Sequence, residues 1–256
     1  MRWIWVRHGE TEANVKGCYL GHIDSPLTKR GYEQAEIVAE RIAEIFEKRI
    51  PEDVSINDAK SFSSLGEVRL YTSDLGRCTE TASIIGKRLA VEATPDSRLR
   101  ELDFGQWEGR TYDEVMCMDQ ELMRRWYDDP FTLAPPDGET LNQLGHRVDE
   151  WFVEKMDVPL TNRTTGATTD TTYDAETNTS SGTSTDNETK ETTEETTEET
   201  IIVVTHGGPI RWFQSRWLLQ DRAAYWKVAG VPPGEKVIVD YEIGRIRETL
   251  IKANRI

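Results

Sequence analysis

The sequence has little of three things, and each shortage excludes a class of protein. It has no apolar run long enough to cross a bilayer, so we expect no membrane-spanning segment. It has only three cysteines, and their spacing fits neither a disulfide framework nor a metal site. It has fewer cations than anions, and the net charge of −15 argues against nucleic acid or an anionic membrane as the main partner.

The cysteines and the first residues also bear on where the protein works. Cys18, Cys78 and Cys117 show no pairing pattern and suit a reducing compartment. The chain starts directly with a strand-like run, with no basic segment followed by a hydrophobic signal region. We therefore expect a cytoplasmic protein.

Much of the negative charge belongs to one segment, residues 161–200. It carries ten Asp or Glu against Arg163 and Lys190, so its charge of −8 leaves only −7 for the rest of the chain. Seventeen of its forty residues are threonine and almost none is large and apolar, so it cannot bury enough surface to offset its ordering entropy. We predict a single domain over residues 1–256, interrupted by a disordered Thr/Glu-rich insertion at about 161–200.

Polar residues that can carry chemistry follow three apolar runs. Residues 3–6 end at Arg7-His8-Gly9, residues 201–204 end at Thr205-His206-Gly207, and residues 68–71 lead to Arg77. Such runs are typical of buried strands, and ligands bind outside the carboxyl ends of the strands in an open α/β sheet. The sequence therefore predicts two histidines and two arginines in one crevice, an anion site that contains a nucleophile.

Helical periodicity separates these strands. Apolar residues recur at three- and four-residue steps after Thr28, which predicts a helix capped by that hydroxyl. Asp74 is the expected cap of a second helix, and further helical patterns cover residues 111–129 and 139–156. Residues 236–241 and 245–251 predict two closing strands.

Four motifs, in order along the chain, resemble those of the histidine phosphatase superfamily, which includes phosphoglycerate mutases and many small-molecule phosphatases. They are Arg7-His8-Gly9-Glu10-Thr11 with Asn14, Ser73-Asp74-Leu75-Gly76-Arg77 with Thr81-Ala82, Glu101 within residues 99–105, and His206-Gly207-Gly208. The resemblance implies a phosphoglycerate mutase-like fold of the α/β class: a three-layer sandwich with a mostly parallel central sheet flanked by helices.

The resemblance also assigns catalytic roles. His8 is expected to be the nucleophile, because a neutral imidazole nitrogen can accept a phosphoryl group and release it to water. Arg7 and Arg77 offer planar forks that match phosphoryl oxygens, and His206 is a second positive or donating group. Glu101 is the expected proton donor to the leaving alkoxide.

Residues around this core are candidates for substrate binding. The set consists of Asn14, Tyr19, Leu20, Gly21, His22 and Gly207. For Asn14, capping of the local backbone is a serious alternative to donation onto the phosphoryl oxygens. Tyr19 and His22 lie in a run that resembles the substrate rim of the family, although a rim position also has purely structural explanations.

Three functions remain open at this point. The first is a metal-independent phosphomonoesterase working through a phosphohistidine, the second a phosphoglycerate mutase-type phosphoryl transfer, and the third a non-catalytic binding or regulatory protein. In phosphoglycerate mutases an arginine pair lies closer to the paired prolines than residues 124–125 do to residues 135–136, which favours hydrolysis. Every expected catalytic residue type is present, which argues against the third.

The run of residues 21–27 resembles members of the family that act as α-ribazole phosphatase in cobalamin biosynthesis. We therefore expect a small-molecule phosphate ester as the partner, no nucleic acid, no membrane, no cofactor and no metal. A homodimer is left open.

Overall fold

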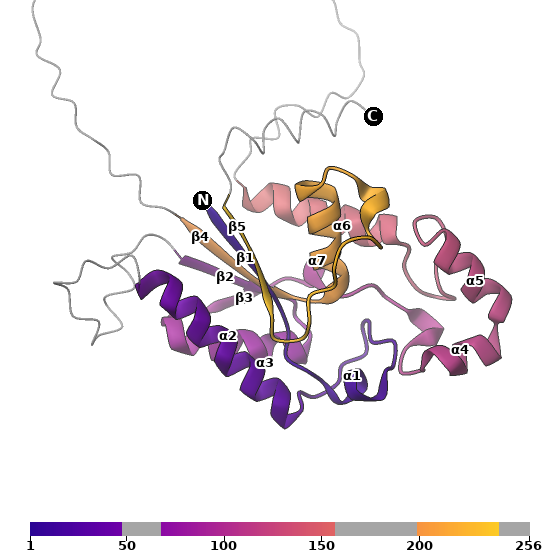
Figure 1. Ribbon diagram of the computed structural model, residues 1–256, viewed down its shortest axis with the longest axis horizontal. Coiled ribbons are helices and arrows are strands. Elements are labelled where there is room, and N and C mark those ends of the chain that lie inside the picture. Colours follow the sequence, from indigo (N-terminus) through magenta and orange to yellow (C-terminus); the bar gives the residue numbers. More distant parts are fainter. Residues whose placement is uncertain (48–67, 157–198, 241–256) are drawn as a thin grey trace, which may run out of the picture.

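The computed structural model describes residues 1–47, 68–156 and 199–240, and its centre is a five-stranded sheet (Figure 1). The strands are β1 (Arg2–Arg7), β2 (Val68–Thr72), β3 (Ala93–Pro95), β4 (Thr200–Thr205) and β5 (Lys236–Asp240). Their order is β3-β2-β4-β1-β5, and every neighbouring pair is parallel except β1 with β5. The predicted α/β class with a mostly parallel sheet is confirmed.

The pleat of β1 explains why helices cover both faces of the sheet. Successive strand side chains point to opposite faces, so Trp3 and Trp5 lie on one face and Ile4 and Val6 on the other. All four are fully buried, and each pair belongs to a separate apolar cluster. A strand buried on both faces needs a layer of helices on each.

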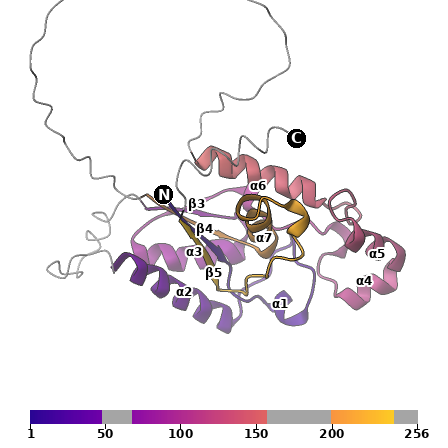
Figure 2. The same ribbon diagram turned by 45° about the horizontal axis from the view of Figure 1, so that its top comes forward.

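The two helical layers are visible in Figure 2. Helices α2 (Lys29–Glu47) and α3 (Gly76–Leu89) pack on the face of Ile4 and Val6. Helices α6 (Leu141–Lys155) and α7 (Gly207–Phe213) pack on the face of the two tryptophans. The result is the expected three-layer sandwich.

Shorter helices lie beyond the carboxyl ends of the strands (Figure 1): α1 (Glu12–Lys16), α4 (Tyr112–Met118) and α5 (Gln120–Asp128). The helical pattern expected over residues 111–129 is broken at Asp119, whose carboxylate accepts from Leu122 N at 2.9 Å and so begins α5. Single turns cover Ser97–Leu99, Gly105–Trp107, Gln214–Leu218 and Arg222–Ala224, the last labelled η5.

Several boundaries can be compared with the predictions. The Thr28 hydroxyl accepts from Gly31 N at 3.0 Å, which confirms the predicted cap of α2. Strand β4 begins at Thr200, which we had placed in the insertion. This is a correction: Thr200 is buried and pairs with Arg2 and Val68. Residues 161–198 of the insertion and the predicted strand at 245–251 lie outside the described residues.

A search of the described residues for a helix of sufficient length and hydropathy to cross a membrane found none.

Candidate active site

The ends of three parallel strands meet at one edge of the sheet. Residue His8 follows β1, Ser73 follows β2 and His206 follows β4. The backbone joins them, since His8 N donates to Thr205 O at 3.0 Å and Ser73 N donates to Val204 O at 2.9 Å. The two imidazoles therefore lie edge to face, with ring centroids 5.2 Å apart.

His8 is held as a neutral imidazole with one free nitrogen. Its Nδ1 lies 2.7 Å from Gly9 O, and because a carbonyl can only accept, Nδ1 carries the proton and Nε2 presents a lone pair. The side chain is buried, and burial followed by the charges of Arg77 and Arg7 holds the pKa of His8 well below its usual value. A neutral ring whose second nitrogen has no partner among the described residues is the form that a nucleophile requires.

The imidazole of His206 has the opposite tautomer to that of His8. Its Nδ1 accepts from Arg77 Nε at 3.2 Å, so the proton lies on Nε2, which is 2.9 Å from Ser73 Oγ. Burial, with Arg77 and His8 as smaller causes, lowers the pKa of His206 well below its usual value. Of the two roles that we expected for this residue, a positive charge and a donor, a neutral ring fits the donor, and in this structure its N–H is directed at Ser73 Oγ.

Arg7 has an unoccupied hydrogen-bonding edge. Its Nη1 donates to Val231 O at 2.9 Å, whereas its buried Nε has no partner among the residues that the structure describes. The guanidinium packs against Gly207, where an added Cβ would lie 3.6 Å from Arg7 Cζ. Burial lowers the pKa of Arg7, with Arg211 and Arg77 acting in the same direction and Glu101 against them. A buried guanidinium with an unpaired N–H is a place where an anion would be stabilised.

Arg77 does not offer the open fork that we expected. It is almost completely buried, and its Nη2 donates to Gly21 O at 2.6 Å while its Nη1 donates to Ile23 O at 3.0 Å. The Asp24 carboxylate lies 3.3 Å from the same Nη1. Because the loop over residues 21–24 uses these donors, Arg77 fixes the loop and His206 as well as supplying charge.

Glu101 lies at the start of α7. Its two carboxylate oxygens accept from Gly208 N at 3.1 and 3.0 Å, and one of them accepts from Leu102 N at 2.9 Å. A side chain at position 208 would displace this carboxylate, so the glycine allows its close approach to the helix. The first turn of α7 thus binds a carboxyl group of the protein itself.

The expected substrate-binding residues fall into two groups. Asn14 Oδ1 accepts from Thr11 N at 3.1 Å and completes the cap of α1, which is the structural alternative that we had named. Gly207 borders Arg7, and Gly21 contributes its carbonyl to Arg77. Leu20 is half-buried. Substrate contact at these positions stays a prediction.

The rim residues His22 and Tyr19 have partners within the protein. His22 Nε2 lies 3.2 Å from Glu101 O, and its Nδ1 lies 3.4 Å from the Asp103 carboxylate. The Tyr19 hydroxyl pairs with that of Tyr127 at 2.8 Å. Both side chains are therefore fixed next to elements of the site, and their contact with substrate stays a prediction.

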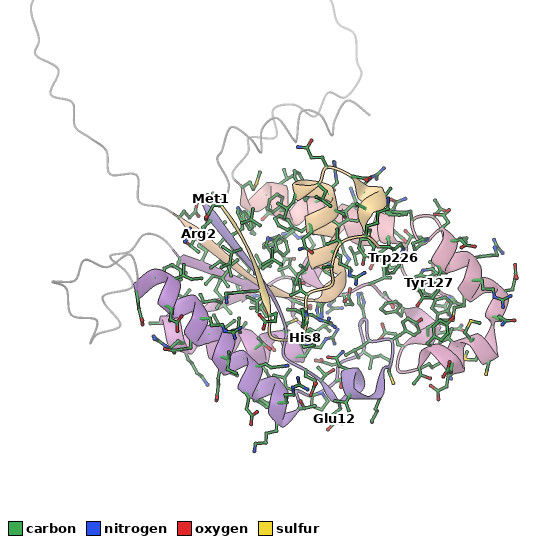
Figure 3. All side chains as sticks on the ribbon, in the orientation of Figure 1. Met1, Arg2, His8, Glu12, Tyr127 and Trp226 are labelled. Carbon is green, nitrogen blue, oxygen red and sulfur yellow. The ribbon has the colours of Figure 1, made fainter. Side chains whose placement is uncertain are left out.

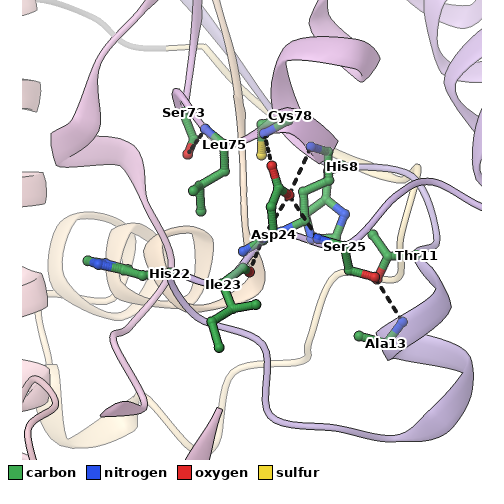
Figure 4. Close-up of polar contacts among 12 residues, drawn as sticks. His8, Thr11, Ala13, His22, Ile23, Asp24, Ser25, Ser73, Leu75 and Cys78 are labelled. Carbon is green, nitrogen blue, oxygen red and sulfur yellow. Dashed lines mark hydrogen bonds and ion pairs between the residues drawn. The ribbon is translucent and has the colours of Figure 1, made fainter. Parts of the chain in front are cut away.

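Asp24 is the residue that sequence reasoning missed. Its carboxylate accepts from Gly76 N and lies 3.4 Å from Arg77 N, so it caps α3 from a distant loop (Figure 4). We had predicted Asp74 as this cap, and the prediction is wrong because the Asp74 carboxylate binds Arg100 instead, at 2.7 and 2.5 Å. A cap that comes from 52 positions away leaves no local signal.

Across residues 1–47, 68–156 and 199–240, no group of three or more His, Cys, Asp or Glu side chains could hold a metal ion. The chemistry available there is a neutral imidazole nitrogen, an arginine with a free edge and a carboxylate.

Comparison of the sequence with known proteins agrees with this inventory. The model of the histidine phosphatase superfamily (branch 1) matches residues 3–55, 58–164 and 159–254. A probable phosphoglycerate mutase GpmB of Salmonella arizonae is 34% identical over 158 residues, which are 62% of this chain and 64% of that protein. Its counterpart in Serratia proteamaculans is 35% identical over 145 residues, 57% and 58% of the two chains. The chain thus spans less than two thirds of the length of these curated relatives.

Solved structures agree over a longer stretch. Bacillus stearothermophilus YhfR superposes with a TM-score of 0.64 at 25% identity, covering 94% of this chain and 91% of that one. The α-ribazole phosphatase of Shigella flexneri superposes with a TM-score of 0.62 at 24% identity, with the same coverage of both chains. At this identity the similarity shows the fold alone. Because the family model matches most of the sequence and the fold agrees, the chain belongs to the histidine phosphatase superfamily.

Proposed function

We propose that the protein is a phosphomonoesterase that transfers the phosphoryl group of a small ester first to His8 and then to water. One observation carries the proposal: the buried Nε of Arg7 has no partner in the described part of the chain, next to a neutral His8 with a free Nε2. A buried donor without a partner is costly, and a phosphoryl oxygen would satisfy it.

The reaction has two steps. His8 Nε2 attacks phosphorus, the ester P–O bond breaks, and Glu101, which enters this step in its protonated form, gives its proton to the leaving oxygen. Water then attacks the phosphohistidine while Glu101 takes a proton from it, which releases phosphate and restores both residues. The Arg7 fork and the buried Arg77 stabilise the charge on the phosphoryl oxygens throughout.

A mutase is the second candidate, and the similarity to probable phosphoglycerate mutases supports it. A mutase would return the phosphoryl group to the bound product instead of to water. The arginine pair at residues 124–125 lies farther from the paired prolines than in mutases, which favours hydrolysis. Among phosphatase substrates we propose α-ribazole 5′-phosphate first, because residues 21–27 resemble that branch of the family.

The test is a panel of esters assayed with the purified full chain in the presence of EDTA. The panel contains α-ribazole 5′-phosphate, 3-phosphoglycerate and p-nitrophenyl phosphate. We expect release of inorganic phosphate, with inhibition by vanadate as a mimic of the five-coordinate phosphoryl group. Conversion of 3-phosphoglycerate to 2-phosphoglycerate without phosphate release would favour the mutase. Activity that EDTA abolishes and a divalent metal restores would contradict the mechanism.

A further inference from the structure

Three exposed aromatic side chains form a continuous surface, which we call the aromatic patch: Tyr112, Tyr127 and Trp226. Their exposed fractions are 49%, 42% and 45%, which is high for rings of this size. The centroids of Tyr112 and Tyr127 are 6.2 Å apart, and those of Tyr127 and Trp226 are 6.1 Å apart. Figure 3 shows Tyr127 and Trp226 side by side, contributed by α5 and the segment after η5. Exposed apolar surface that is contiguous in this way marks a binding site more often than a scattered single residue does.

The rings of the patch are held in position from below. Trp126 is buried and packs against both Tyr127 and Trp226, with centroid distances of 4.9 and 6.2 Å. The Tyr127 hydroxyl is fixed by Tyr19 at 2.8 Å. A ligand would therefore meet rings that are already ordered, which lowers the entropic cost of binding.

The patch is connected to Glu101 through α7. The Arg211 guanidinium lies 5.8 Å from the Trp226 ring. Arg211 follows Gly208 by one turn of α7, and the N–H of Gly208 donates to both oxygens of the Glu101 side chain at 3.1 and 3.0 Å. Trp226 also packs on the buried Tyr225, with ring centroids 5.0 Å apart.

This position determines what the patch would meet during the reaction. Glu101 protonates the oxygen of the leaving group, so the leaving group must lie on the side of the phosphoryl group that faces Glu101. Of the three rings of the patch, Trp226 is the one that α7 and Arg211 connect to Glu101. We propose that the aromatic patch binds a planar aromatic ring carried by the leaving group, with Trp226 as the principal contact. The inference rests on the proposed phosphomonoesterase function and names the class of its substrate.

Two esters with matched chemistry test the inference: 2-phenylethyl phosphate and 2-cyclohexylethyl phosphate. Both release a primary alkoxide, so the need for protonation is the same, and they differ only in the ring. Ring stacking adds a moderate gain beyond area burial, so we expect the wild type to favour the phenyl ester in kcat/KM by about two- to tenfold. Trp226→Leu should remove the preference, and Trp226→Phe should keep most of it.

The matched control is Tyr32→Leu on α2, because Tyr32 is 43% exposed and its hydroxyl donates to Glu80, not to any residue of the patch. The control should keep the wild-type preference. Tyr127→Leu is the second variant, assayed in the same way and by calorimetric binding of 2-phenylethylphosphonate, so that a fold defect in one variant does not decide the result.

The outcomes separate the two proposals. Equal hydrolysis of both esters by the wild type, or a preference that survives in Trp226→Leu and Tyr127→Leu, would overturn the aromatic subsite and leave the phosphomonoesterase standing. A wild type that hydrolyses no ester and forms no phosphohistidine would overturn the proposed function, and the subsite with it.

Discussion

The phosphoryl-binding end of the site and the aromatic patch are built in different ways. The first consists of buried side chains at strand ends, where Arg77, His206 and Ser73 are joined by hydrogen bonds. The second consists of half-exposed rings from short helices and a turn, held by packing. Fixed polar geometry suits a reaction that is the same for every ester, whereas exposed rings on peripheral elements suit selection among leaving groups.

The largest effect is expected from a substitution of Arg7, which removes part of the phosphoryl-binding end of the site. Arg7→Ala should lower kcat/KM by about 10³-fold, because it removes charge and the free fork from the transition state. Arg7→Lys should recover only part of this loss, since a lysine keeps the charge without the planar fork. The phenyl and cyclohexyl esters should lose activity by the same factor. Steady-state kinetics that show a loss confined to one ester would place Arg7 in leaving-group recognition.

A second substitution tests the boundary between the two regions. Glu101→Gln should slow hydrolysis of alkyl phosphates by about 10²-fold, because their leaving oxygens need a proton. The loss for p-nitrophenyl phosphate should be clearly smaller, since nitrophenolate is a good leaving group. Equal losses for both esters, measured as kcat, would remove Glu101 from the role of proton donor.

The lowered pKa values of the buried histidines predict how the stability of the protein depends on pH. The pKa values of His8 and His206 are held well below 6.5 in the folded protein, so below pH 6.5 the unfolded chain takes up protons that the folded protein does not. The free energy of unfolding therefore has its full value above pH 6.5 as far as these histidines are concerned. Below pH 6.5 it falls by about 1.4 kcal/mol per pH unit for each histidine.

Urea unfolding at pH values from about 7 to about 5.5 would measure this slope. His206→Gln should reduce the slope of the unfolding free energy against pH by the amount that one histidine contributes. His146→Gln, whose imidazole is 76% exposed on α6, is the matched control and should keep the wild-type slope. An unchanged slope in His206→Gln would mean that the folded protein protonates this ring as readily as the unfolded chain does.

The smallest effect is expected for the Thr/Glu-rich segment, because of the end of β4 at which it joins the sheet. It enters β4 at Thr200, whereas His206 follows the other end of that strand. Replacing residues 163–198 with a short Gly-Ser linker should leave turnover within about threefold, because the cost of loop closure grows only logarithmically with length. Kinetics at low and high salt provide the measurement. A large, salt-dependent change in KM would show that the acidic segment gates the pocket.

The two regions also differ in how far the sequence predicts them. The apolar runs before His8 and His206 are local signals, and the parallel pairing of β1 with β4 brings their ends together as expected. The occupation of both Nη groups of Arg77 depends on a loop more than 50 positions away, so no local pattern reveals it.

No local sequence pattern reveals the aromatic patch either, because its rings come from α4, α5 and the turn after η5 and meet only through packing. Asp74 shows the opposite case, in which a local sequence signal is present and misleads. Its position just before α3 suggested a cap, but the nearby Arg100 competes for the carboxylate and binds it.

The central claim is that His8 carries the phosphoryl group, and trapping the intermediate tests it most directly. The wild type would be mixed with a turned-over ester, quenched within the first turnovers and digested under neutral or alkaline conditions that preserve phosphohistidine, and its peptides analysed by mass spectrometry. The account predicts one phosphate on the peptide that contains His8, and no labelled peptide in His8→Ala. A phosphate on the His206 peptide, or a label that persists in His8→Ala, would contradict it.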